Sequence, residues 1–182
     1  MTNSLMTPQE AIAVAYRADR YLRGFRPNPR RALDVVQSVQ EDAELAGADP
    51  QANRIVRGAI CAVTGDCYRM LGEVTTAADW YRRAAGHWKG GLGYPFLYAD
   101  MVVEHRLTGH YRIALDCLRH EEAYWRSKPL LYRVYHNLNS LWWLYPLCWK
   151  QRWRERSLGL RLEALIQGQE GAGSQGTLPR EG

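Results

Sequence analysis

Apolar residues recur along most of the chain at intervals of three and four positions, which is the period of an amphipathic α-helix. The first such stretch begins at Thr7-Pro8-Gln9-Glu10, a capping box with proline at the first helical position, and we expect it to end at Gly24. Asn28-Pro29 and Asp49-Pro50 open the next two stretches in the same way. No stretch shows the alternation of a strand, so the pattern predicts an all-α protein.

Proline and glycine also mark where the later helices are expected to begin and end. We expect them from about Thr76 to Trp88, from Pro95 to Gly109, from Tyr111 to Trp125, and on both sides of Pro146 after an opening at Pro129. Pro8, Pro50, Pro95 and Pro129 would then each open the first helix of a pair. We therefore expect a single domain over residues 1–167 and a disordered tail, rich in glycine and serine, over residues 168–182.

Small and aromatic residues repeat in a fixed order in the middle of the chain. The order is G-x2-Y-x3-G-x4-A-x3-Y-x2-A, formed by Gly65, Tyr68, Gly72, Ala77, Tyr81 and Ala84. Gly65 and Ala77 allow two antiparallel helices to approach closely, and Gly72 suits the left-handed residue that ends a helix. This order resembles the tetratricopeptide repeat (TPR), whose period is about 34 residues. The alternative is an unrelated helical hairpin that uses small residues in the same way.

A second, weaker copy of the pattern follows. Gly109 and Ala114 stand 37 residues after Gly72 and Ala77, and we place the three extra residues in the loop at residues 90–93. The resemblance implies a right-handed stack of about four antiparallel helix pairs, a TPR-like α-solenoid whose terminal pairs act as caps.

In TPR proteins the first helix of each pair lines a concave groove that holds a protein or peptide segment. By position, the resemblance implies a partner-binding groove lined by Asp66, Arg69, Met70, Phe96, Val103, Arg106 and Leu107. Arg69 and Arg106 would then be equivalent residues that hold a carboxylate of the partner. The alternative is that they pair with acidic residues of the chain itself. The resemblance implies a non-catalytic adaptor or chaperone-type scaffold that needs no cofactor.

The charge of the chain adds a second candidate surface. The net charge is +5, and residues 123–156 alone hold seven basic residues against Glu155, a net +6, so the remainder is close to neutral in sum. Aromatic residues interleave with these cations, and the candidate surface comprises Trp125, Arg126, Tyr132, Arg133, Trp142, Trp149, Arg152 and Trp153. Three interpretations stay open: a packed last helix pair, a surface for a partner or for homo-oligomer formation, and nucleic-acid stacking or membrane-surface binding. Binding of RNA or DNA through this segment is the main alternative function.

Other functional classes lack a motif. The four cysteines are scattered without a CxxC pair, which is typical of small core residues in a reducing cytoplasm rather than of metal ligands. The five histidines form no HExxH motif, and Asp116 with His120 is an isolated acid–histidine pair at helical spacing. There is no apolar run of about 18 residues and no N-terminal signal pattern. We therefore expect a cytoplasmic protein that is not an enzyme and holds no metal.

Overall fold

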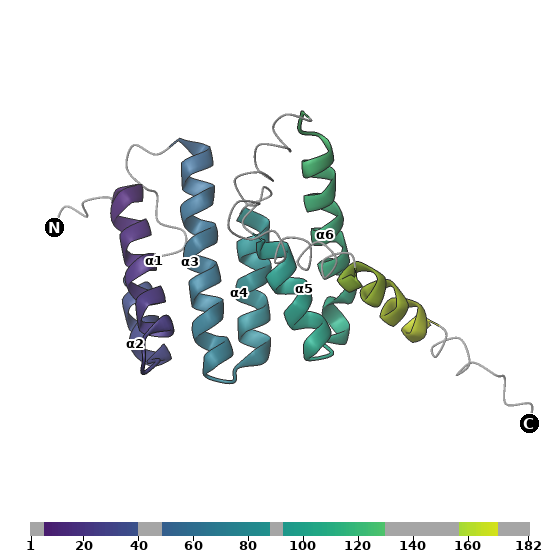
Figure 1. The fold of residues 1–182 in the computed structure, drawn as a ribbon, viewed down its shortest axis with the longest axis horizontal. Coiled ribbons are helices and arrows are strands. Elements are labelled where there is room, and N and C mark those ends of the chain that lie inside the picture. Colours follow the sequence, from purple (N-terminus) through teal and green to yellow (C-terminus); the bar gives the residue numbers. More distant parts are fainter. Residues whose placement is uncertain (1–5, 40–48, 88–92, 130–156, 171–182) are drawn as a thin grey trace, which may run out of the picture. The chain divides into compact units, whose positions relative to one another are not determined.

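The described part of the chain is helical (Figure 1). The computed structural model describes residues 6–39, 49–87, 93–129 and 157–170. Its helices are α1 (Pro8–Arg23), α2 (Pro29–Val36), α3 (Pro50–Met70), α4 (Val74–His87), α5 (Tyr94–Glu104) and α6 (Tyr111–Arg126), with the 3-10 helix η1 (Thr108–His110) before α6 and a further helix over residues 157–170. Because these residues include no strand, the predicted all-α class is confirmed.

The first three helices begin at the caps that the sequence predicts. The Thr7 hydroxyl accepts a hydrogen bond from the Glu10 amide at 3.3 Å, and the Glu10 carboxylate accepts one from the Thr7 amide at 2.8 Å. The Asn28 side chain accepts from the Arg31 amide at 3.0 Å, and Asp49 caps α3 in the same manner. These side chains satisfy amides that the first turn of a helix leaves without a partner.

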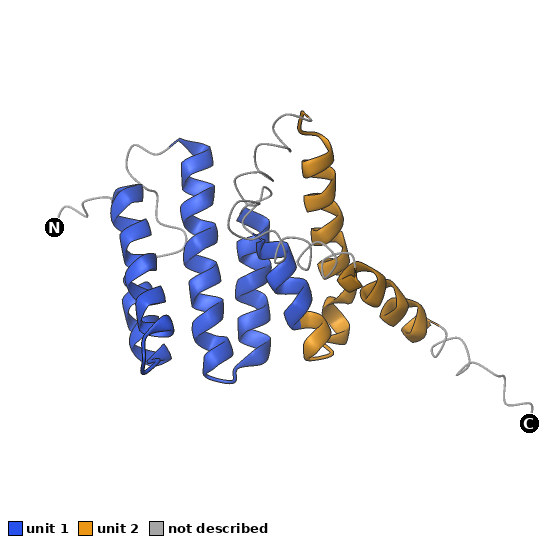
Figure 2. Cartoon of the chain, in the orientation of Figure 1, with its two compact units in different colours: residues 1–101 blue, residues 102–182 orange. Residues whose placement is uncertain are grey.

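The chain divides into two compact units, residues 1–101 and residues 102–182, with the division inside α5 (Figure 2). In the first unit α3 packs against α1 and α2 on one side and against α4 on the other. This arrangement explains why α3 carries apolar residues on two faces. The core between α1, α2 and α3 consists of Ala11, Ala15, Ala18, Leu22, Ala32, Val36, Val39, Val56, Ile60 and Cys67.

Close packing of α3 on α4 depends on the small residue at position 65. A Cβ atom added to Gly65 would lie 2.9 Å from two ring carbons of Tyr81, well inside van der Waals contact. Ala77 and Ala84 of α4 are fully buried, and Tyr81 is almost so. The predicted role of Gly65, close approach of two helices, is thereby confirmed.

Two helices end in the same kind of left-handed turn. At the end of α3, Gly72 has φ +82°, and the amides of Gly72 and Glu73 donate to the carbonyls of Arg69 and Tyr68 at 3.1 and 2.9 Å. This pair of bonds is the Schellman motif. The end of α5 repeats it with the amides of residues 106 and 107 donating to the carbonyls of residues 103 and 102 at 3.4 and 3.0 Å. Arg106, with φ +53°, therefore occupies the position that Gly72 has in the first turn.

This geometry corrects the predicted alignment of the two copies. Gly72 and Arg106 are 34 residues apart, whereas the next helices begin at Val74 and Tyr111, 37 residues apart. The three additional residues are those of η1, not an insertion in residues 90–93. The prediction that α5 runs to Gly109 is also wrong, because the left-handed turn ends the helix at Glu104.

Other predicted boundaries differ less. α4 begins at Val74, two residues before the predicted start, and α6 runs from Tyr111 to Arg126, close to the prediction. The last described helix continues to residue 170, three residues into the predicted tail. The rest of the predicted tail and the helices predicted around Pro146 lie outside the described residues. The single domain over residues 1–167 stays a prediction.

A candidate functional site on helix α3

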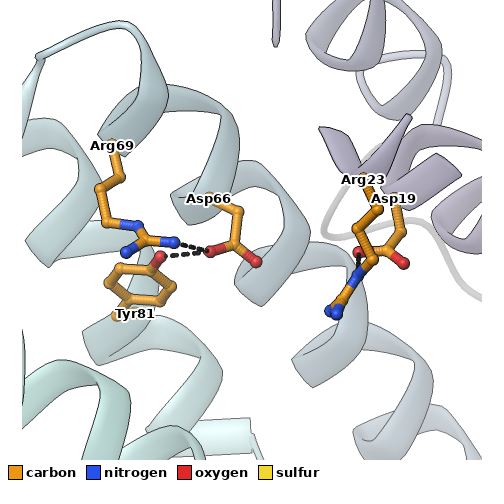
Figure 3. A network of polar contacts seen from close by, with 5 residues as sticks. All are labelled: Asp19, Arg23, Asp66, Arg69 and Tyr81. Atoms are coloured by element: carbon orange, nitrogen blue, oxygen red, sulfur yellow. Dashed lines mark hydrogen bonds and ion pairs between the residues drawn. The ribbon is translucent and has the colours of Figure 1, made fainter. Parts of the chain in front are cut away.

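The carboxylate of Asp66 on α3 makes polar contacts with two other side chains (Figure 3). Its Oδ1 atom accepts a hydrogen bond of 2.7 Å from the Tyr81 hydroxyl of α4. The same oxygen lies 3.3 Å from a guanidinium nitrogen of Arg69, one turn further along α3. Asp66 is thus held in one orientation by two donors from two helices.

Burial fixes the proton of Tyr81. Removal of the Tyr81 side chain from water raises the pKa of its hydroxyl, and the adjacent Asp66 carboxylate raises it further. The hydroxyl therefore stays protonated and donates to Asp66 over the whole physiological pH range. Arg69, by contrast, keeps 55% of its side chain exposed, so the outer part of the cluster faces solvent.

A second ion pair lies on the neighbouring helix. Arg23, near the end of α1, donates from Nε to the Asp19 carboxylate at 2.7 Å (Figure 3). Asp19 raises the pKa of Arg23, and the more distant Asp66 adds a small further contribution. α1 packs against α3, so the two ion pairs lie on neighbouring helices (Figure 3). We call Asp19, Arg23, Asp66, Arg69 and Tyr81 the α1–α3 polar cluster.

The predicted groove residues differ in what they present to solvent. Met70 is 43% exposed at the end of α3, next to Arg69. Phe96 and Val103, however, are buried, so their side chains are core residues rather than groove-lining ones. Arg106 is exposed and Leu107 half-buried, both in the turn after α5. Asp66, Arg69, Met70 and Phe96 belong to the first compact unit, and the other three belong to the second.

The predicted equivalence of Arg69 and Arg106 is wrong. Aligned on the left-handed turns, Arg69 corresponds to Val103, and Arg106 corresponds to Gly72. Asp66 then corresponds to Asp100, so an aspartate, not an arginine, recurs between the copies. The ion pair with Asp66 is the alternative that the sequence left open for Arg69.

Most of the second candidate surface lies outside the described residues. Of its members only Trp125 and Arg126 are described, at the end of α6. The Trp125 ring meets Tyr124 edge to face at 5.8 Å between centroids, and Arg126 pairs with Glu122 at 2.6 Å. Tyr132, Arg133, Trp142, Trp149, Arg152 and Trp153 lie outside the described residues.

The side chains that commonly bind metal ions do not gather in the described part of the chain. No cluster of three or more histidine, cysteine or acidic side chains there is placed to hold a metal ion. His120 contacts the main-chain oxygen of Asp116 at 2.8 Å rather than its carboxylate. A shallow hollow of about 300 Å³ lies in the second unit, bridged by the Arg112–Glu170 ion pair. None of the residues that line it belongs to either predicted surface.

The position of Asp66 in the sequence points to its bond with Tyr81. Asp66 directly follows Gly65, the residue against which the Tyr81 ring packs. An acceptor beside that close approach is within reach of the phenol hydroxyl, and a buried tyrosine hydroxyl needs a hydrogen-bond partner. The Tyr81–Asp66 bond was therefore predictable once the two helices were paired.

Comparisons with known proteins leave the residues themselves as the guide to function. Among the described residues, no helix has the length and apolar character needed to cross a membrane. A scan against protein-family models, a search of curated proteins and a search of solved structures each gave no match.

Proposed function

We propose that the chain is a non-catalytic, TPR-like scaffold that binds a segment of another protein on the surface shared by α1 and α3. The observation that carries this proposal is the α1–α3 polar cluster, in which Asp66 is oriented by Tyr81 while Arg69 faces solvent. Such a cluster is a preorganised anchor, because its core is fixed before a partner arrives.

The packing order supports the TPR-like part of the proposal. Contacts join α1 to α2, α1 to α3, α2 to α3 and α3 to α4, as expected for successive antiparallel pairs in a right-handed stack. Gly65 at the close approach and Gly72 in the turn add the local features of the repeat. In such a stack the first helices of the pairs, here α1 and α3, form the binding side.

The exposed groups on this side suit a peptide with both charge and apolar character. An exposed ion pair contributes about 0–1 kcal/mol to stability, so Arg69 can exchange Asp66 for a carboxylate of the partner at little cost. Met70 beside it offers a flexible apolar contact. Cys61 and Cys67 are buried and form no disulfide, which suits a cytoplasmic location as part of the same proposal.

The test compares two matched arginine variants of the full chain. Arg69 and Arg82 each pair with an aspartate three residues earlier, at 3.3 and 3.4 Å, and have exposed fractions of 55% and 46%. Affinity capture from native lysate, quantified by mass spectrometry after RNase treatment, should recover a protein with the wild type and with Arg82→Ala. Arg69→Ala should recover about tenfold less of that protein, because loss of a charged anchor costs about 1.4 kcal/mol or more.

Two results would contradict the proposal. Equal recovery with Arg69→Ala and Arg82→Ala would remove Arg69 from the binding surface. Recovery that disappears on RNase treatment would show that the captured protein was linked through RNA. Far-UV circular dichroism of both variants checks that each remains helical.

A further inference from the structure

Residues 16–31 carry a concentrated positive charge that the total for the chain conceals. This segment contains six arginines (Arg17, Arg20, Arg23, Arg26, Arg30 and Arg31) and Asp19 as its single acid, a net charge of +5. It covers the second half of α1, the connection to α2 and the start of α2. We call residues 16–31 the basic turn.

The basic turn has a defined backbone. The Asn28 amide donates to the Tyr21 carbonyl at 2.9 Å and closes the connection between α1 and α2. The Arg31 guanidinium stacks over the Tyr21 ring at 4.8 Å from its centroid, which joins the start of α2 to the end of α1. Phe25 lies in the connection that these two contacts close, and its side chain is fully exposed.

Most of the cations in the basic turn are available to a ligand. All six arginines are exposed. Arg23 pairs with Asp19, but no ion pair joins Arg17, Arg20, Arg26 or Arg30 to any acid in the described ranges. Tyr16, Arg20 and Arg23 share one face of α1 by their spacing, and the opposite face is buried in the core. Tyr16 is 68% exposed on that outer face.

We propose that the basic turn binds single-stranded nucleic acid, with the arginines on phosphates and Phe25 stacked on a base. Arginine-lined surfaces with exposed aromatic rings are the usual means of binding single strands without sequence preference, since every base has a stacking face. A fully exposed phenylalanine gains from such a contact, because stacking removes its ring from water.

Two other polyanions fit the observations less well. In a duplex the bases are stacked on one another, so no base face is open for the Phe25 ring to stack on. A membrane surface favours a helix with a broad exposed apolar side, whereas the apolar side of α1 is buried against α2 and α3. Only Phe25 at the turn would enter the lipid. This proposal concerns a different ligand from the protein segment proposed above, and its test uses purified components.

The experiment measures fluorescence anisotropy of a labelled oligouridine of about 12 nucleotides, a length within the range of known single-strand sites, with the full chain at several salt concentrations. Four free arginines predict a slope of log K against log salt of about −2.8, at about −0.7 for each neutralised phosphate. Phe25→Ala should weaken binding about tenfold at all salt concentrations. The double variant Arg20→Gln, Arg26→Gln should reduce the slope by about 1.4.

Matched controls separate a site from general charge. Arg82→Gln with Arg161→Gln removes the same net charge from exposed positions elsewhere, and Leu160→Ala removes an exposed apolar side chain of the second unit. Both should leave the affinity within about twofold of the wild type. All substituted positions are exposed, and circular dichroism confirms folding.

The proposal is overturned by no binding at low salt, or by equal losses from the arginine variant and its control. It is overturned also if Phe25→Ala binds the oligouridine like the wild type, which would place any binding elsewhere. Vesicles containing anionic phospholipid provide the third arm. Binding to vesicles that depends on Phe25, without binding to the oligouridine, would assign the basic turn to a membrane surface instead.

Discussion

Gly65 shows how one missing side chain determines the packing of two helices. The Tyr81 ring lies 2.9 Å from the position that a Cβ of residue 65 would take, and the ring cannot swing aside freely, since its hydroxyl is bonded to Asp66. The sequence pattern predicts that Gly65 permits close approach. The pattern does not indicate that the close approach of α3 and α4 also orients the Asp66 carboxylate of the proposed binding surface. Packing and the candidate site are therefore coupled at this residue.

Substitution of Gly65 tests that coupling. Gly65→Ala should lower the free energy of unfolding by about 1–2 kcal/mol, because overpacking costs about 1–3 kcal/mol and the better helix propensity of alanine returns up to about 1 kcal/mol. Gly86→Ala is the matched control on α4, where nothing lies within 4 Å of the added Cβ. It should raise stability by about 0.5–1 kcal/mol. Urea unfolding measures both, and equal effects would show that Tyr81 does not restrict residue 65.

At the scale of helices, starts were easier to predict than ends. Thr7, Asn28 and Asp49 cap α1, α2 and α3 as expected, because a capping side chain followed by proline is a local signal. The end of α5 was misplaced since its left-handed residue is Arg106, whereas sequence rules look for glycine and found Gly109. The error then moved Arg106 into a false equivalence with Arg69. One unusual φ angle thus altered the predicted site.

The two left-handed turns predict opposite responses to substitution. Gly72→Ala should destabilise the protein by about 1 kcal/mol, because a Cβ disfavours the left-handed region by roughly 1–2 kcal/mol. Arg106→Gly should stabilise it by up to about 1 kcal/mol, since relief of the same strain exceeds the added entropy of the unfolded chain. Chemical denaturation of the two variants provides the comparison. A clear loss of stability in Arg106→Gly would instead reveal a contact of the arginine side chain that outweighs the strain.

At the scale of the whole molecule, summed charge is a poor guide to where a surface lies. Residues 123–156 carry +6 of the net charge of +5, so the rest of the chain has a net charge of only −1. That remainder nevertheless contains the +5 of the basic turn, which acidic residues elsewhere offset. The all-α class follows from periodicity and glycine placement. The sites do not, because they depend on which exposed residues the fold brings together.

The raised pKa values in the first compact unit predict a loss of stability at alkaline pH. Burial, with a contribution from Asp66, raises the pKa of Cys67 to about 12 from the ordinary 9.0. Burial, with smaller contributions from Cys61 and Tyr16, raises that of Tyr94 to about 12 from 10.0. The unfolded chain therefore releases these protons at lower pH than the native protein. Their stabilising effect is complete below about pH 9 and is lost as the pH rises towards 12.

Urea unfolding at a series of pH values between about 7 and 11 would measure this loss. The wild-type midpoint should fall above about pH 9, and the double variant Cys67→Ala, Tyr94→Phe should show a shallower fall from a lower starting value, because it lacks both titrating groups. Leu160→Ala, at an exposed position of the second unit, serves as the control and should follow the wild-type slope, because it removes no titrating group. Equal slopes for the double variant and Leu160→Ala would mean that alkaline unfolding begins outside the core of the first unit. In that case the burial of Cys67 and Tyr94 would not limit the stability of the α1–α3 surface on which the proposed function depends.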